Sequence, residues 1–143
     1  MNYGRINLEN TFYELLPESE AKKIYSPISK ELQHIYLQYC RHKQFKSVMP
    51  IFESEFHDIN NDIIGYYDHG ELVAFSIIRI YDSRNIEAIQ FAWNYSNPKL
   101  RIGINSLKHE CAYYKDKGFK HYYVGGCEKY KTRLAGFEIL GPE

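Results

Sequence analysis

The sequence predicts an α/β (α+β) fold in which helices flank one mixed central β-sheet. Two β-rich runs, 63–67 and 72–80, are separated by a glycine-containing turn, which is the pattern of a β-hairpin. A third run, 86–93, follows and completes an antiparallel meander. The chain then continues as turn, helix and strand, and a right-handed crossover of that kind joins two parallel strands. The sheet should therefore contain both strand directions.

The first third of the chain predicts a short strand followed by two helices. A strand is expected at 11–16. Ser26 is expected to cap the next helix, with Pro27 at its first position, where the missing N–H does no harm. Apolar residues recur at steps of three and four from Ile28 to Cys40, so this helix should cover the sheet with one face. A second, shorter helix is expected over 49–56.

The last third predicts a helix between two strands. An apolar stripe runs from Ile104 through Leu107 and Cys111 to Tyr114, and the helix should extend from Gly103 to about Lys117. Gly118 is expected to take the left-handed conformation that closes a helix, because glycine adopts it without a steric penalty. A strand over 119–125 should follow.

Composition narrows the class of protein. The length of 143 residues predicts a single domain, 1–143, with a core that needs no disulfide or metal. Eighteen basic residues balance eighteen acidic ones, which argues against tight nonspecific RNA binding. No apolar window is long enough to cross a membrane, so a cytoplasmic protein without a membrane partner is expected. Oligomeric state is left open.

The cysteines and histidines predict no metal site. Cys40, Cys111 and Cys127 are odd in number and far apart, with no CxxC pair, which disfavours a disulfide framework and a structural zinc site. The six histidines lack metal-ligand spacing and any HExxH pattern. Reduced thiols and surface or hydrogen-bonded histidines are expected.

The turn between the third strand and the following helix is the candidate anion site. Backbone N–H groups at a helix start lack partners within the helix, and the helix dipole adds about half a positive charge there. A phosphate or carboxylate would fit. In the alternative interpretation, Gly103 only relaxes the backbone between two elements. The candidate donor-binding residues are Arg101, Ile102, Gly103, Ile104, Asn105 and Ser106.

The order of these elements resembles the GNAT acyltransferase fold, and it is more specifically similar to the C-terminal catalytic region of arginyl-tRNA and leucyl-tRNA protein transferases and, more loosely, to Fem-type peptidyltransferases. The likeness covers about residues 30–141. The usual GNAT turn begins with Gln or Arg and ends with Gly or Ala, whereas Leu100 and Asn105 hold those positions here. The segments that carry the likeness are 35–39 with His42, 70–75, 86–93, 100–106, 122–125, and 130–133 with 138–140.

The resemblance implies roles for two groups of residues. Tyr130 follows the strand after which GNAT enzymes often place a tyrosine that protonates the departing thiolate; alternatively, it lines the core or a groove. Trp93, Asn94 and Tyr95 end the strand beside the donor turn, where they would line the acceptor groove; alternatively, Trp93 belongs to the core and Asn94 forms a turn.

A candidate general base comes from the residues themselves. Acyl transfer to an amine requires removal of a proton, and Glu87 on the third strand of the meander is a carboxylate that burial could tune toward neutral pH. In the alternative interpretation, its side chain points outward into solvent.

The first hypothesis is therefore a GNAT-like N-acyltransferase or aminoacyltransferase. Its donor would be acyl-CoA, such as acetyl-CoA, or aminoacyl-tRNA, and its acceptor an amine such as a peptide N-terminus or a small molecule. The alternative is a noncatalytic GNAT-like module that binds a peptide or protein partner. An RNA-contacting factor is a third possibility, which the neutral net charge disfavours.

Overall fold

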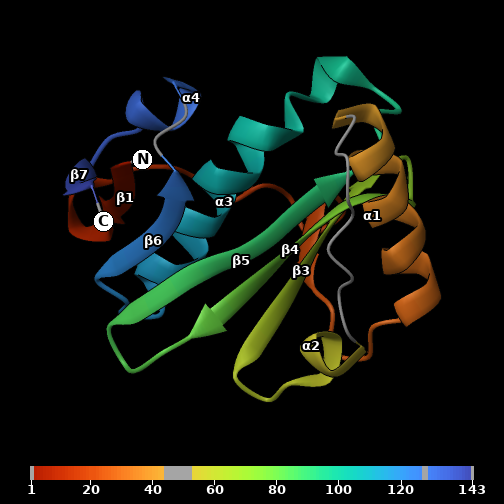
Figure 1. The fold of residues 1–143 in the computed structure, drawn as a ribbon, viewed down its shortest axis with the longest axis horizontal. Helices are drawn as coiled ribbons and strands as arrows, with labels where there is room; N and C mark the ends of the chain where they lie inside the picture. The colour runs from red at the N-terminus through yellow and green to blue at the C-terminus, as the bar shows by residue number, and fades with distance from the viewer. Residues whose placement is uncertain (1, 44–52, 127–128, 143) are drawn as a thin grey trace. The chain divides into compact units, whose positions relative to one another are not determined.

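In the part of the chain that the structure describes, seven strands form one mixed sheet in the order β2-β3-β4-β5-β6-β1-β7, which confirms the predicted fold class (Figure 1). The computed structural model describes residues 2–43, 53–126 and 129–142. β5 and β6 run parallel, whereas β1 is antiparallel to both β6 and β7. The strands are β1 (Asn2–Asn7), β2 (Ala21–Lys23), β3 (Asn61–Asp68), β4 (Glu71–Ile80), β5 (Asn85–Trp93), β6 (His121–Gly126) and β7 (Phe137–Pro142). The helices are α1 (Ser29–Lys43), α2 (Glu53–His57), α3 (Ile102–Asp116) and α4 (Lys129–Thr132), with short 3-10 turns η1 (Leu8–Asn10) and η2 (Pro98–Leu100).

The chain folds into two compact units. The terminal unit, which holds both chain ends, consists of Met1–Leu16, Arg79–Ala88 and Gly103–Glu143. The central unit consists of Pro17–Ile78 and Ile89–Ile102.

The hairpin of the central unit forms as the sequence predicts. His69 and Gly70 connect β3 to β4, and both have positive φ, 51° and 83°. Two successive residues of positive φ are typical of the type I′ turn, whose twist matches that of the strands it joins. The two-residue connection makes β3 and β4 antiparallel neighbours.

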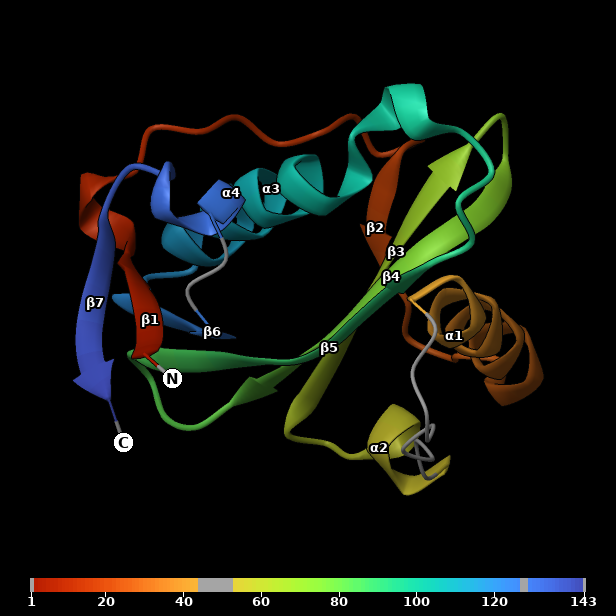
Figure 2. The ribbon, with the colours of Figure 1, turned by 45° about the horizontal axis from the view of Figure 1, so that its top comes forward.

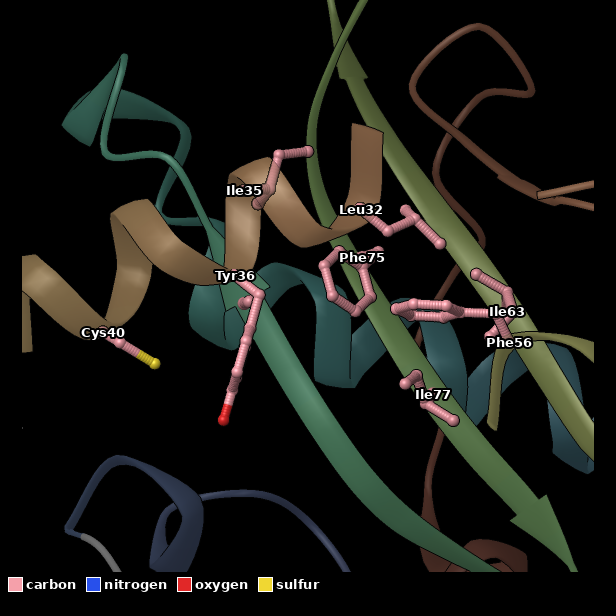
Figure 3. Close-up of a cluster of buried hydrophobic side chains, with 9 residues drawn as sticks. Leu32, Ile35, Tyr36, Cys40, Phe56, Ile63, Phe75 and Ile77 are labelled. Carbon is pink, nitrogen blue, oxygen red and sulfur yellow. The ribbon is translucent and has the colours of Figure 1, made fainter. Parts of the chain in front are cut away.

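The core of the central unit lies between α1 and the β3–β4 hairpin (Figure 3). Residues at helical spacing on α1 supply one side of it, as the apolar stripe predicts. Phe56 from α2 meets Phe75 edge-to-face, with ring centroids 6.2 Å apart. The buried side chains of this cluster are Leu32, Ile35, Tyr36, Cys40, Phe56, Ile63, Phe75, Ile77 and Ala92.

Two helix boundaries differ from those predicted. The predicted cap at Ser26 is wrong, because α1 begins at Ser29. The N–H groups of Glu31 and Leu32 both donate to the Ile28 carbonyl (3.0 and 3.3 Å), so Ile28 supplies the first acceptor of the helix. The predicted helix over 49–56 begins outside the described residues, and its described part is α2, which ends one residue later, at His57.

The terminal unit packs α3 against β6. Leu107, Cys111 and Tyr114 of α3 are buried, as their spacing predicts. Gly118 has a φ of +92°, which confirms the predicted helix end. Ile86 of β5 lies opposite Tyr122 in the parallel β5–β6 pair, which confirms the predicted crossover.

The predicted strand over 11–16 is wrong. Thr11 instead closes a local turn, because its N–H and its Oγ1 both donate to the Leu8 carbonyl (3.1 and 2.7 Å). The N–H of Leu16 donates to Nδ1 of His109 on α3 (3.0 Å) rather than to a strand. The first strand is β1, which lies side by side with β7 (Figure 2).

Candidate functional site

The candidate donor turn is built by a short 3-10 turn and one left-handed residue. Asn97 caps η2, because its side-chain oxygen accepts the N–H of Lys99 (3.2 Å). Its amide group also donates to Asp68 Oδ2 (3.4 Å). Arg101 then takes a φ of 47°, and α3 begins at the next residue. The left-handed conformation of Arg101 therefore turns the chain into the start of α3.

Gly103 lies in the first turn of α3 and has no conformational reason to be glycine. Glycines such as Gly118 and Gly136 have positive φ, and a Cβ at Gly65 would meet Ile24 at 2.7 Å. At Gly103 φ is not positive, and a Cβ would meet no heavy atom within 4 Å. Since glycine within a helix costs about 1 kcal/mol relative to alanine, the fold alone does not explain this residue. The space beside its backbone is open.

The other predicted donor residues differ in exposure. Ile102 is buried, Arg101 is exposed, and Ile104 and Asn105 are half-buried. The Ser106 hydroxyl is buried and donates to the Gly103 carbonyl (3.0 Å), so it braces the first turn. Within an α-helix, the N–H groups of Ile102, Gly103 and Ile104 have no carbonyl four residues earlier to bond.

The predicted acceptor residues lie in an aromatic cluster of the central unit. Trp93 ends β5, and the Asn94 N–H donates to the Val73 carbonyl (3.0 Å). Tyr95 has a positive φ of 58°, and its ring lies 4.4 Å from that of Trp93. Burial raises the pKa of Tyr95, and the Trp93 side chain acts in the opposite direction.

Two residues of α1 complete this cluster. The Tyr95 ring stacks on His42, with centroids 3.6 Å apart and planes 17° apart, and it also stacks on Tyr39 (6.0 Å, 10°). Sequence reasoning included His42 only within a resembling segment and gave it no role. The contact joins residues more than fifty positions apart, so no local spacing could have indicated it.

Glu87 lies near the start of β5, in the terminal unit. It stands opposite Tyr123 of β6, and its carboxylate accepts a hydrogen bond from the Tyr81 hydroxyl (3.1 Å). The negative charge of Glu87 raises the pKa of Tyr81. Trp93 ends the same strand but belongs to the central unit.

A line of polar residues crosses the sheet from Glu87. Arg5 of β1 stands opposite Tyr123 and donates to its hydroxyl (3.2 Å). The same guanidinium pairs with Glu138 of β7 (3.2 Å), and these two contacts raise the pKa of Arg5, with Tyr123 the larger cause. Paired residues of neighbouring strands share one face of a sheet, so these polar groups form a line across four strands.

Tyr130 lies on the short helix α4 and is half-exposed. The neighbouring Lys131 ammonium donates to the Val124 carbonyl (2.9 Å) and lies 5.9 Å from the centre of the Tyr130 ring. Val124 belongs to β6, so this bond ties α4 to the strand that precedes it. Cys127 lies outside the described residues.

Three further titratable groups of α3 are buried. The Glu110 carboxylate accepts a hydrogen bond from the Tyr122 hydroxyl (2.6 Å) inside the terminal unit. Burial raises the pKa of the Cys111 thiol, so it stays protonated and a poor nucleophile. Burial lowers the pKa of His109, which accepts the Leu16 N–H.

The described part of the chain shows neither a cluster of metal ligands nor a helix that could span a membrane. Residues 2–43, 53–126 and 129–142 bring no three His, Cys, Asp or Glu side chains together as a metal site would. None of the helices that the structure describes has the length and apolar character needed to cross a membrane.

Comparison with known proteins shows the fold. No family model and no curated protein matches the chain. A C-terminal domain assigned to lysylphosphatidylglycerol synthetases, from Agrobacterium fabrum, matches 87% of the chain at 11% identity with a TM-score of 0.62. L-PGS from Bacillus licheniformis matches 87% at 14% identity (0.64), and a GCN5-related N-acetyltransferase from Kribbella flavida matches 96% at 12% identity (0.61). The chain has a GNAT-like fold.

The matched region accounts for only part of each of these three structures. The chain covers 46% of the Agrobacterium structure, 46% of the Bacillus structure and 53% of the Kribbella structure. The chain therefore spans about half the length of these proteins. At these identities the likeness extends to the fold and not to the donor or the acceptor.

Proposed function

We propose that this chain is a GNAT-like N-acyltransferase that moves an acyl or aminoacyl group to an amine. The observation that carries the proposal is Gly103. It is a helical glycine with a sterically open Cβ position and a negative φ, in the first turn of the helix that GNAT-like folds place after the donor turn. An anion such as the pyrophosphate of coenzyme A could approach the backbone N–H groups there without meeting a side chain.

The donor is acyl-CoA, such as acetyl-CoA, or aminoacyl-tRNA. Both classes of enzyme occur among the names of similar structures, which include a GCN5-related N-acetyltransferase and L-PGS. The resemblance to arginyl-tRNA and leucyl-tRNA protein transferases supports the aminoacyl donor. Leu100 stands where the usual GNAT turn has Gln or Arg, which favours a donor other than acetyl-CoA.

The reaction is a direct attack on the donor. The amine nitrogen of a peptide N-terminus or a small molecule bonds to the acyl carbon, and the thioester C–S bond or the ester C–O bond breaks. Glu87 takes the proton of the amine. The Tyr81 hydroxyl occupies only one of the two carboxylate oxygens, so the second oxygen accepts the proton. Tyr130 returns a proton to the departing sulfur or oxygen. Positioning and backbone N–H groups supply most of the rate enhancement.

Gly103→Ala separates an effect on donor binding from an effect on the stability of the fold. Alanine should raise the free energy of unfolding by about 0.5–1 kcal/mol, because φ is compatible and the site is open. The same methyl group should weaken donor binding at least about tenfold by blocking approach to the backbone. Calorimetric titration with acetyl-CoA, longer acyl-CoAs and charged tRNA measures binding, and urea unfolding measures stability.

Asp116→Ala, at the other end of α3, is the matched control and should leave donor binding unchanged. If no donor binds the unaltered protein, the transferase proposal fails. If a donor binds equally well to Gly103→Ala, the donor lies elsewhere and the site assignment fails.

A noncatalytic module that binds a peptide or protein partner is the second candidate. Leu100 favours it, because the residue type that contacts the donor in the usual GNAT turn is missing. This candidate predicts that every donor fails to bind while Gly103→Ala still stabilises the fold. Binding of any donor at the first turn of α3 would remove its main support.

A further inference from the structure

The aromatic cluster of the central unit is a stack of three nearly parallel rings. Tyr39 and Tyr95 are 10° from parallel, and Tyr95 and His42 are 17° from parallel. His42 ends the stack and is exposed, whereas Tyr39 and Tyr95 are half-buried. The stack therefore ends in an exposed imidazole.

Two properties of Tyr95 are energetically unfavourable and are not required by its packing. Its φ of 58° is unfavourable for a residue with a side chain, by about 1 kcal/mol or more. Its hydroxyl is buried and makes no hydrogen bond of normal geometry with the described residues, and only the Trp93 side chain offers it partial compensation, which is also unfavourable. Unfavourable conformations held by their surroundings cluster at functional sites.

Two cationic side chains belong to the same helix as the stack. Arg41 and Lys43 flank His42 on α1, and all three are exposed. The Lys43 ammonium lies 5.8 Å from the centre of the Tyr39 ring. A bound cation would be repelled here, whereas a planar ring that carries negative charge meets both a ring face and cations.

We infer that the stack formed by Tyr39, Tyr95 and His42 binds a nucleotide, with the base stacked on the outer face of His42 and the phosphate near Arg41 and Lys43. Base stacking on aromatic rings combined with basic side chains is a general mode of nucleotide recognition. The inference rests on the proposed function for the identity of the nucleotide. Coenzyme A and the 3′ end of tRNA both carry adenosine, so the shared ligand is an adenine nucleotide.

AMP titrated into the full chain tests the stack directly. A base on the face of His42 should shift its imidazole C–H signals in the proton spectrum through the ring current. His34 is exposed on the same helix and serves as the internal reference, which should not move. Trp93 is the single tryptophan of the chain and lies 4.4 Å from Tyr95, so its emission should change with the same affinity.

Variants separate stacking from charge. His42→Ala should weaken AMP binding roughly tenfold, the loss expected for one base–aromatic stack. His42→Phe keeps an aromatic face and should retain most of the affinity, and His34→Ala should have no effect. Affinity should also fall with added salt, because the phosphate contacts are electrostatic.

Two probes that lack the base decide which chemical class of ligand the stack binds. Ribose phosphate supplies charge without a base, and choline supplies a cation without a base. The inference is overturned if His42 does not respond to AMP, if ribose phosphate binds as well as AMP, or if choline binds better than AMP. It is also overturned if His42→Phe loses as much affinity as His42→Ala.

The source of the nucleotide is resolved by two further ligands. The bisphosphorylated adenosine of coenzyme A and a short RNA that ends in CCA are compared by calorimetric titration, and the tighter ligand identifies the donor class. AMP binding without transfer from any donor would leave this inference standing and defeat the proposed function. Transfer that persists in His42→Ala with unchanged donor affinity would defeat this inference and leave the proposed function standing.

Discussion

The hydroxyl of Tyr95 yields a stability prediction at the scale of one residue. It is buried and makes no hydrogen bond of normal geometry with the described residues, although the nearby Trp93 side chain acts on its pKa as a hydrogen-bonding group. The folded protein therefore loses the hydration of this oxygen with little compensation. Tyr95→Phe removes only this oxygen and should raise the free energy of unfolding by about 1 kcal/mol, measured by urea titration. Tyr39→Phe, in the same stack, is the matched control and should give no such gain. A less stable Tyr95→Phe would mean that the hydroxyl has a stabilising partner.

Gly136 is the glycine whose substitution should be most damaging. Its φ is +76°, and a Cβ would lie 2.4 Å from the carbonyl oxygen of Asn7. That approach accompanies the bond from the Asn7 N–H to the Gly136 carbonyl (2.8 Å). Gly136→Ala should lower the free energy of unfolding by more than about 2 kcal/mol, because steric clash adds to the left-handed conformation.

Gly141→Ala separates the two causes. Gly141 also has a positive φ, +91°, but a Cβ there meets no atom within 4 Å. It should therefore lose only the conformational part, about 1–2 kcal/mol. Equal losses in the two variants, by urea titration, would show that the contact with Asn7 relaxes at no energetic cost.

Residues were predictable from the sequence where their conformation is local. Gly118 was assigned a left-handed φ from its place after an apolar stripe, and it has one. The role of His42 was not predictable, because its contact with Tyr95 depends on how α1 meets the end of β5. Glu87 was chosen for its residue type, and its hydrogen bond from Tyr81 and its pairing with Tyr123 became known only from the structure.

Among the elements, hairpins and the crossover helix were predicted well, and the first strand was not. The β3–β4 turn and the α3 stripe are encoded by neighbouring residues. β1 has no such signal, since it is held by pairing with β6 and β7, more than one hundred residues later in the chain. The 11–16 segment has strand-like composition, but its described hydrogen bonds go to Leu8 and His109.

The bond between the 11–16 segment and α3 should make stability depend on pH. The Leu16 N–H donates to Nδ1 of His109, which can accept only when that nitrogen is unprotonated. Burial lowers the pKa of His109 below its ordinary value of 6.5. The unfolded chain therefore binds a proton more readily than the folded one. The contribution of the Leu16–His109 hydrogen bond to the free energy of unfolding is full above pH 6.5 and declines as the pH falls below that value.

Urea unfolding at a series of pH values measures this contribution. The unaltered protein should lose stability from about pH 6.5 downward, before most carboxylates titrate. His109→Gln should flatten the profile in that window, and His34→Gln, an exposed histidine on α1, should not. An unchanged profile in His109→Gln would assign the pH dependence to other groups.

At the scale of the whole molecule, the strand order brings the two chain ends into one unit. β1 is inserted between β6 and β7, so the terminal unit is assembled from the first and last segments of the chain together with a piece of the meander. The central unit is assembled from a nearly continuous stretch. The sequence predicted the mixed sheet and its parallel crossover, but not this insertion, because long-range pairing leaves no periodic pattern in the strands concerned.

This assembly predicts that damage to β1 spreads to β6 and β7. Ile6 is fully buried, and it pairs with Tyr122 on one side and Phe137 on the other. Ile6→Pro removes a ladder donor and clashes within a central strand, at a cost of about 3 kcal/mol or more. Hydrogen exchange should then show lost protection across His121–Gly126 and Phe137–Pro142, while Asn61–Asp68 in the central unit keeps its protection. Glu14→Pro, in an exposed segment without assigned secondary structure, is the control and should leave both units protected. Uniform loss of protection in Ile6→Pro would mean that the two units unfold as one cooperative structure.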